Sequence, residues 1–528
     1  MRKLIVKGKE FSAVQVQVGD DIVAKHAASE FVKYMGKMGI PEGEGLTVKL
    51  YRDENIGIDG YRIHIADENT LELVGDYHRG MMYAVYDFLK IYAGARFFTP
   101  TIETLGEGDI VVDKDTEYVP DFEWRSVFFQ KYTQDKYWSA KNHLSVNITP
   151  EFGKDIGVYS AGGIHTFEKF SGVPQEKQPC LSDPEVLKKA IAWVREVIET
   201  TPNVRSVSVS QNDNVKGYCT CEKCAAVDAE EGSHAGTLIR FLNAIAEDVC
   251  KDYPDVLIET FAYYYTQKAP KITKAHPNVY IRMCSMCNCF SHSIDDSSCP
   301  ANRQFHQDVD DWYKVVGVKR MHVWDYVANF AGAGYIHPNP NFTTMRDNMR
   351  YYAEHGVKHM GPQGAWDSYN SGEFGELRTY LLAQLMWNPY MDANEYYTHM
   401  DEFLEAYYGA GWRYIRAFIN WTTSEARQGH MTINKKPFEI IARDKWEAMV
   451  ETCDLWWNKA LEMAGDKADN VKFSKLQWDF MRLQFHPDAE KAEKLIDTVE
   501  GNKMYWSETW VHVRRDRMDQ PPDTWFEY

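Results

Sequence analysis

The sequence predicts an α/β protein in three parts: a small α/β domain over residues 1–119, a (β/α)8 TIM-type barrel over 120–390 and a helical domain over 391–528. Three observations support this prediction. The chain has 528 residues, which is too many for one compact core. Its middle part alternates short apolar runs with helical segments, and the strand-like runs stop after Asn388-Pro389.

In the first 119 residues, apolar residues recur with two different periods, one typical of strands and one typical of helices. The runs KLIVKG, AVQVQV, LTVKLYR and YRIHIA alternate as half-buried strands do, and TLELVG follows as a hairpin partner. Apolar residues recur at helical spacing from Val23 to Met38 and from Met81 to Tyr92, after which Gly94 stands where a C-cap glycine belongs. The acidic stretch 113–120 ends in proline and is interpreted as a linker.

The barrel is predicted from strand-like runs that recur about every 30–50 residues. The candidate strands are 123–129, 144–148, 205–210, 256–265, 279–286, 320–326 and 357–363, with a short one near 157–160. Seven or eight such strands fit a (β/α)8 barrel, whose catalytic residues lie at the carboxyl ends of the strands. An open doubly wound sheet is the alternative, but it would need a glycine-rich phosphate turn after a strand, and the sequence has none.

The last part of the chain has helical periodicity. Apolar residues from Trp446 to Met463 mark a long amphipathic helix, one of several that we expect up to residue 500. These helices predict a C-terminal domain that packs on the barrel.

The composition of the chain excludes several classes of protein and of binding partner. Apolar residues make up 44% and charged residues 26% of the chain, which excludes a disordered or fibrous protein. The net charge of −18 repels nucleic acids and anionic membranes. The sequence shows no signal-peptide run and no membrane-spanning stretch, so we expect a cytoplasmic protein, with a homo-oligomer left open. In that compartment the ten cysteines are expected to be thiols or metal ligands.

Polar and aromatic residues gather where the predicted strands end, a pattern that suits a carbohydrate. Carboxylates and amides match sugar hydroxyls, and aromatic rings match the apolar C–H face of a sugar. Glycoside cleavage also needs two carboxyl groups beside the bond, and Asp213 and Asp325 are the catalytic candidates. The candidate substrate-binding residues are Arg125, His165, Gln211, Asn212, Tyr263, Trp324, Tyr326 and Gln363.

Each acid also has a simpler interpretation. Asp213 could cap the helix that follows it, and Asp325 could accept a backbone hydrogen bond in a turn. Glu259 shares strand parity with Tyr263, so it could lie below the site, or it could form a buried ion pair with Arg282.

Two cysteine clusters follow predicted strands. Cys219, Cys221 and Cys224 form C-x-C-x2-C just after Asp213, and C-x2-C-x-C begins at Cys284. Thiolates at this spacing can bind zinc, which takes four tetrahedral ligands, and the fourth would be His234 or a cysteine of the second cluster. We interpret such a zinc as structural, bracing the Asp213 loop; unligated thiols are the alternative.

Several segments resemble known families. The segment 75–100 (GDYHRGMMYAVYDFLKIYAGARFFTP) resembles the domain that precedes the barrel in family 20 hexosaminidases and family 67 α-glucuronidases. The segments SVSQNDNVKGYCTCEKC (208–224), ETFAYYYTQKAP, MHVWDYVANF, HPNPNF and LLAQLMWNP are similar to domain of unknown function 4838, a family linked to glycoside hydrolase family 163 and its endo-β-N-acetylglucosaminidase activity. The resemblance implies a glycosidase-type cleft, with Asp213 as an acid and Asp325 as a second acid or substrate ligand. It also implies an acidic residue where this chain reads CSMCNC, near Cys287.

These observations predict a glycoside hydrolase that acts on an oligosaccharide or small glycoside, such as a β-linked N-acetylhexosamine, and needs no cofactor for its chemistry. The reaction would use two carboxylates or a 2-acetamido group of the substrate as nucleophile. Two alternatives stay open: a metal-dependent hydrolase or lyase with a cysteine-bound metal, and a barrel that binds carbohydrate without cleaving it.

Overall fold

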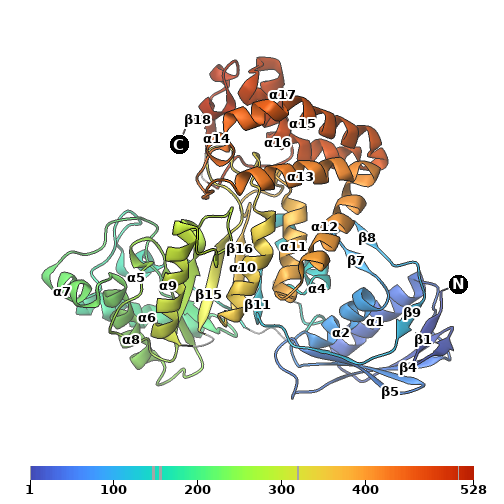
Figure 1. The fold of residues 1–528 in the computed structure, drawn as a ribbon. Helices are drawn as coiled ribbons and strands as arrows, with labels where there is room; N and C mark the ends of the chain where they lie inside the picture. Colours follow the sequence, from blue (N-terminus) through green and yellow to red (C-terminus); the bar gives the residue numbers. More distant parts are fainter. Residues whose placement is uncertain (1, 146–148, 154–156, 318–319, 509–510, 528) are drawn as a thin grey trace. The chain divides into compact units, whose positions relative to one another are not determined.

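The computed structural model describes residues 2–145, 149–153, 157–317, 320–508 and 511–527 (Figure 1). The chain forms two compact units, each built from separate stretches of sequence. Unit 1 comprises residues 1–155, 327–349 and 362–528, and unit 2 comprises 156–326 and 350–361. In the part of the chain that the structure describes, no helix combines the length and the apolar composition that crossing a bilayer requires.

The start of unit 1 contains the strands and helices predicted for the first 119 residues. A five-stranded sheet has the order β10-β5-β6-β4-β3, and the long helices α1 and α2 pack against each other and against its strands (Figure 1). Helix α1 begins after Asp21, whose carboxylate accepts the backbone N–H groups of Val23 and Ala24 and so caps the helix. The bounds are β3 Val14–Val18, α1 Ile22–Lys37, β4 Leu46–Arg52, β5 Tyr61–Asp67, β6 Thr70–Gly75, α2 Gly80–Ile91 and β10 Thr116–Tyr118. Smaller sheets pair β2 Lys9–Phe11 with β1 Leu4–Val6 and β9 Ile110–Val112, and β7 Arg96–Phe97 with β8 Glu103–Thr104.

The rest of unit 1 is mainly helical, as the periodicity after residue 390 predicts. The predicted amphipathic helix is α15, Arg443–Met463, and its inner face buries Trp446 and Trp457 against Phe418 of α13. The other helices are α3 Gln130–Thr133, α4 Lys136–Lys141, α11 Gly375–Trp387, α12 Ala393–Tyr408, α13 Trp412–Ala426, α14 Pro437–Ile440, α16 Ala468–Phe485 and α17 Ala489–Gly501. A short hairpin pairs β17 His512–Val513 with β18 Phe526–Glu527.

Unit 2 is built on parallel strands that alternate with helices. Its strands are β12 Ser206–Ser208, β13 Leu257–Ala262, β14 Val279–Cys284, β15 Met321–Tyr326 and the first part of β16, His359–Gln363. Its helices are α5 Phe167–Ser171, α6 Pro184–Thr200, α7 Glu222–Glu231, α8 Ala235–Val249, α9 Pro300–Val316 and the end of α10, Phe342–Glu354 (Figure 1). The pairings β12–β13, β13–β14 and β14–β15 are all parallel.

Of the predicted eight-stranded barrel, the described residues form a curled parallel half-barrel of six strands, in the order β11-β16-β15-β14-β13-β12, and closure into a full barrel stays a prediction. The sixth strand, β11 Trp124–Arg125, belongs to unit 1, as does the end of β16. The predicted short strand near 157–160 forms only isolated bridges beside β12, at Val158 and Ala161. Gly157 and Gly162 have positive φ there, which interrupts an extended strand. The predicted strand 144–148 lies partly outside the described residues.

The two faces of the unit 2 sheet differ in chemistry. Helix α8 packs on β13 and β14, and α9 packs on β14, against the face that carries Ile258 and Ile281. Successive side chains of a strand point to opposite faces. The opposite face therefore carries Glu259, Arg282 and His322, which contact one another across three strands. We call this the polar face of the sheet.

Candidate active site

Asp213 is an accessible carboxylate held by two side chains near the carboxyl ends of β12 and β13. Its side chain is 57% exposed. The Tyr263 hydroxyl donates to Asp213 Oδ1 at 3.2 Å, and His165 Nε2 lies 3.9 Å from the same oxygen. The backbone N–H of Asp213 donates to Gln175 Oε1 at 2.9 Å, which fixes the main chain at this point.

His165 has one ring nitrogen engaged. Its Nδ1 lies 2.8 Å from the carbonyl oxygen of Gln211. A carbonyl oxygen only accepts, so Nδ1 carries the proton, and Nε2 is left as an acceptor in the neutral ring. The 3.9 Å between Nε2 and Asp213 Oδ1 is too long for a hydrogen bond. A ligand hydroxyl or amide can therefore interact with this pair.

Aromatic rings lie beside His165 and Arg282 on the polar face. The ring centroid of His165 lies 5.5 Å from that of Phe261 and 6.1 Å from that of Tyr263. The Arg282 guanidinium lies 5.8 Å from the Phe261 ring centroid and 5.5 Å from that of Trp324. Rings beside a carboxylate can contact the apolar face of a sugar while the acid contacts its polar groups.

Gln211 and Asn212 support the loop instead of binding a ligand. Both are fully buried. Gln211 Nε2 donates to the Tyr263 carbonyl at 2.7 Å and to the Thr266 hydroxyl. Asn212 Oδ1 accepts the N–H of Glu168, and its Nδ2 donates to backbone carbonyls of the 173–177 segment. These amides are satisfied within the protein, so their predicted role in substrate binding is corrected to positioning Asp213.

Asp325 lies on the other face of the sheet from Asp213. It follows His322 by three residues, so its side chain points away from the polar face. There its Oδ1 accepts hydrogen bonds from Ser285 at 2.7 Å and from Tyr352 of α10 at 3.2 Å. Burial raises its pKa to about 6, an effect that the two hydrogen bonds partly offset. The prediction that Asp325 acts beside Asp213 is therefore corrected: it is a buried carboxyl between the sheet and a helix.

Glu259 forms the predicted buried ion pair with Arg282. Its carboxylate lies 2.9 Å from Arg282 Nη2 and also contacts His322 Nδ1 and the Ser160 hydroxyl. Burial alone would raise its pKa, but the attraction of Arg282 and His322 lowers it to about 2. Glu259 is thus a permanently charged part of the sheet core below the aromatic rings.

Four other predicted ligands have different settings. Trp324 and Tyr326 share strand parity with His322, and Trp324 is half-buried. Arg125 and Gln363 belong to unit 1. Arg125 is fully buried and binds Asp59 at 2.7 Å and the His143 carbonyl at 2.7 Å, so it is corrected to a structural ion pair. Gln363 is also buried and donates to Glu508.

The structure adds a fourth cysteine to the first cysteine cluster, which the sequence spacing could not reveal. The Sγ atoms of Cys180, Cys219, Cys221 and Cys224 all lie within 4.8 Å of one another. The fourth residue of this group is Cys180, in place of the predicted His234 or a cysteine of the second cluster. Cys180 precedes the cluster by 39 residues, and only the fold brings it there.

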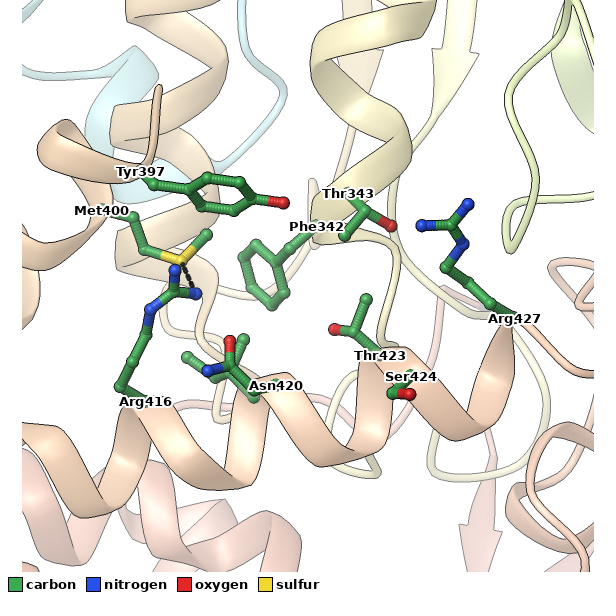
Figure 2. A pocket seen from close by; sticks show the side chains of 10 residues that line it. Phe342, Thr343, Tyr397, Met400, Arg416, Asn420, Thr423, Ser424 and Arg427 are labelled. Carbon is green, nitrogen blue, oxygen red and sulfur yellow. Dashed lines mark hydrogen bonds between the residues drawn. The ribbon is translucent and has the colours of Figure 1, made fainter. Parts of the chain in front are cut away.

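Unit 1 contains a cavity of about 400 Å³ beside α13 and the start of α10 (Figure 2). Arg416 donates to the Met400 sulfur on one side of it, and Arg427 lies on the other (Figure 2). Its described lining residues are Phe342, Thr343, Tyr397, Met400, Arg416, Ile419, Asn420, Thr423, Ser424 and Arg427. None of them is a carboxylic acid, so this cavity cannot supply the proton donor of a glycosidase. The candidate active site is instead Asp213 and its neighbours in unit 2, where an accessible carboxylate contacts Tyr263 and lies near His165.

Two solved structures share the fold. One is described as a GH138 enzyme targeting pectin rhamnogalacturonan II, with 9% identity, a TM-score of 0.55, and 97% of this chain and 76% of that chain covered. The other is described as a family GH115 4-O-methyl-α-glucuronidase with specificity for decorated arabinogalactans, with 10% identity, a TM-score of 0.52, and 98% and 79% covered. No curated protein matches the chain.

The family comparison covers the candidate active site and most of the half-barrel. The match runs over residues 97–420, which is more than half of the chain and includes His165, Asp213, Tyr263 and the first cysteine cluster. The chain therefore belongs to the family described as Domain of unknown function (DUF4838).

Proposed function

We propose that the protein is a glycoside hydrolase whose acid–base residue is Asp213. One observation carries the proposal: an accessible carboxylate lies between the Tyr263 hydroxyl and the His165 imidazole, beside aromatic rings, at the carboxyl ends of parallel strands. This end of the strands is where barrel-type enzymes place their catalytic groups. The two structural neighbours, one described as an enzyme targeting pectin rhamnogalacturonan II and the other as a glucuronidase with specificity for decorated arabinogalactans, support the same class of reaction.

The setting of Asp213 suits proton transfer to a glycosidic oxygen. The exposed carboxylate of Asp213 is accessible to the glycosidic oxygen of a bound sugar. In its protonated form the acid gives its proton to the departing oxygen as the bond from C1 to that oxygen breaks and a bond from the nucleophile to C1 forms. Water then displaces that nucleophile from C1, and the proton that the water loses returns to the Asp213 carboxylate. His165 Nε2 would accept a sugar hydroxyl and orient the ring.

The nucleophile is proposed to come from the substrate. Asp325 faces the helices and Glu259 is buried in its ion pair, so neither is placed to attack C1 beside Asp213. A 2-acetamido carbonyl oxygen can form the bond to C1 itself, which gives a cyclic oxazolinium that water later opens. We therefore propose a β-linked N-acetylhexosamine, in an oligosaccharide or a small glycoside, as the substrate.

Two chromogenic substrates test this proposal. The wild-type protein should cleave a β-N-acetylglucosaminide and leave the matching β-glucoside, which lacks the acetamido group, essentially uncleaved. Asp213→Asn should lower kcat by about 10²- to 10⁴-fold, the contribution typical of a positioned proton donor. Asp255→Asn, at an exposed carboxylate of the same unit, is the matched control and should keep full activity. Undiminished turnover by the Asp213 variant, with an unchanged circular dichroism spectrum, would exclude Asp213 from the reaction.

The two alternative functions, a metalloenzyme and a carbohydrate-binding barrel, predict different results. A catalytic metal needs an open coordination position, whereas the four sulfurs of the first cysteine cluster would complete a tetrahedral shell. Rapid loss of rate on chelation, with the fold intact and activity restored by metal, would favour a metalloenzyme. Glycan binding without any product after long incubation would favour a carbohydrate-binding barrel.

A further inference from the structure

We propose that Cys180, Cys219, Cys221 and Cys224 bind one zinc ion, which fastens together the two loops that hold Asp213. The four Sγ atoms lie within 4.8 Å of one another in unit 2. Two of the thiols are half-buried, Cys221 is exposed and Cys224 is buried. The cluster therefore reaches the surface, where a metal ion can enter.

The sulfur separations fit a tetrahedral zinc site. Zinc–thiolate bonds of about 2.3 Å at tetrahedral angles place neighbouring sulfurs about 3.8 Å apart. Cys180 Sγ lies 3.7 Å from Cys221 Sγ and 3.8 Å from Cys224 Sγ. A disulfide would need about 2.05 Å. A cluster of several iron atoms would hold its cysteines farther apart, so the spacing favours one metal ion.

Donors already point at the sulfurs. The backbone N–H of Cys224 donates to Cys221 Sγ at 3.5 Å, across the first turn of α7. The Ser182 hydroxyl lies 3.0 Å from Cys224 Sγ and can donate to it when that sulfur is a thiolate. Such outer contacts stabilise thiolate ligands and fix their orientation. Four sulfur ligands leave no open position, so the site is structural.

The zinc ion would add a link between the two chain segments whose hydrogen bonds hold the Asp213 loop. Gln178, two residues before Cys180, accepts the N–H of Asn212 at 3.0 Å and donates to its carbonyl at 2.8 Å. The N–H of Gln178 also donates to the carbonyl of Gly217, two residues before Cys219. The 173–180 and 211–219 segments are thus paired along their length, and the zinc would join their ends. The consequence for turnover rests on the proposed function; the consequence for metal content does not.

Metal analysis of the purified full-length chain tests the site directly. We expect one zinc per chain in the wild type and in Cys250→Ser, which removes a half-buried thiol of the same unit outside the cluster. Cys180→Ser should lower the zinc content at least tenfold. Wild-type protein without zinc, wild-type protein with iron in its place, or a Cys180 variant with a full zinc content would each overturn the proposal.

If Cys180→Ser fails to fold, a second measurement on the wild-type chain tests the zinc site. A thiol-specific mercurial added stepwise should release one zinc per chain, as followed with a colorimetric zinc indicator. Cobalt exchanged into the protein should give the intense visible absorption of a tetrahedral cobalt–thiolate centre. Release of no zinc, or an octahedral cobalt spectrum, would contradict the site. Both readouts are independent of glycosidase activity, so failure of the proposed function would leave them unchanged.

Discussion

Asp325 is a buried carboxyl group in a setting that penalises its charge. Burial raises its pKa to about 6, above the value of about 3.9 expected in the unfolded chain. The folded protein therefore holds this proton more tightly, so the contribution of Asp325 to stability falls as the pH rises from about 4 to about 6, and stays low above that. A shift of this size corresponds to about 2–3 kcal/mol.

Asp325→Asn should remove that pH dependence. The amide keeps an oxygen to accept from Ser285 and Tyr352 but carries no charge to bury. The free energy of unfolding, measured by urea denaturation, should change less between pH 4 and pH 8 in this variant than in the wild type, by about 2 kcal/mol. Asp255→Asn should follow the wild type. Equal pH dependence in the Asp325 variant and the wild type would show that the carboxyl is not penalised by burial.

The same variant separates the two acids that the sequence could not distinguish. If Asp325 lies behind the sheet, Asp325→Asn should keep kcat within about threefold of the wild type, whereas Asp213→Asn should lose at least about a hundredfold. Activity on the N-acetylglucosaminide at pH 7 measures the contrast. Comparable losses in both variants would return Asp325 to the reaction. Strand parity distinguishes the two acids, because Asp325 alternates with Trp324 and Tyr326 and so points to the opposite face of the sheet. Its position between two aromatic residues in the sequence does not show which face it is on.

At the scale of elements, the loop around Gln178 decides how firmly Asp213 is held. Gln178→Ala would leave the buried N–H of Asn212 without a partner, at a cost of about 1–3 kcal/mol, whereas the Asn212 carbonyl would keep its hydrogen bond from the N–H of Asn214. We expect kcat to fall about tenfold through misplacement of Asp213, with little change in KM. Gln304→Ala, at an exposed position of α9, is the control and should behave as the wild type. A raised KM at unchanged kcat would indicate that Gln178 affects substrate binding alone.

The elements themselves were largely predictable, because their signals are local. The runs 256–265, 279–286, 320–326 and 357–363 became β13 to β16 with only their ends shifted, since apolar alternation records burial directly. Barrel closure was not predictable in this way. Closure requires pairing between distant segments, and the stretch near 157–160 forms isolated bridges where Gly157 and Gly162 have positive φ. The fourth cysteine was missed for the same reason, because spacing rules describe ligands from one segment only.

At the scale of the whole molecule, the chain passes between its two compact units more than once. It leaves unit 1 at residue 155, returns at 327, leaves again at 349 and returns at 362. Changes in composition along the chain mark only consecutive segments. They therefore cannot identify a compact unit that is assembled from separate stretches of sequence. The domain boundaries at residues 120 and 390 remain predictions from the sequence.

The net charge of −18 acts on any substrate that approaches the protein, and so bears on the class of glycan that it uses. At low ionic strength the field of the whole molecule extends tens of ångströms and repels anions, whereas at about 150 mM salt it is screened within about 8 Å. For two N-acetylglucosaminides that differ only in a neutral or a sulfonated leaving group, kcat/KM should respond differently to salt. The anionic substrate should gain about two- to fivefold between about 10 and 150 mM salt, and the neutral one should stay constant. A decrease for the anionic substrate would mean that local cations, and not the net charge, govern its approach.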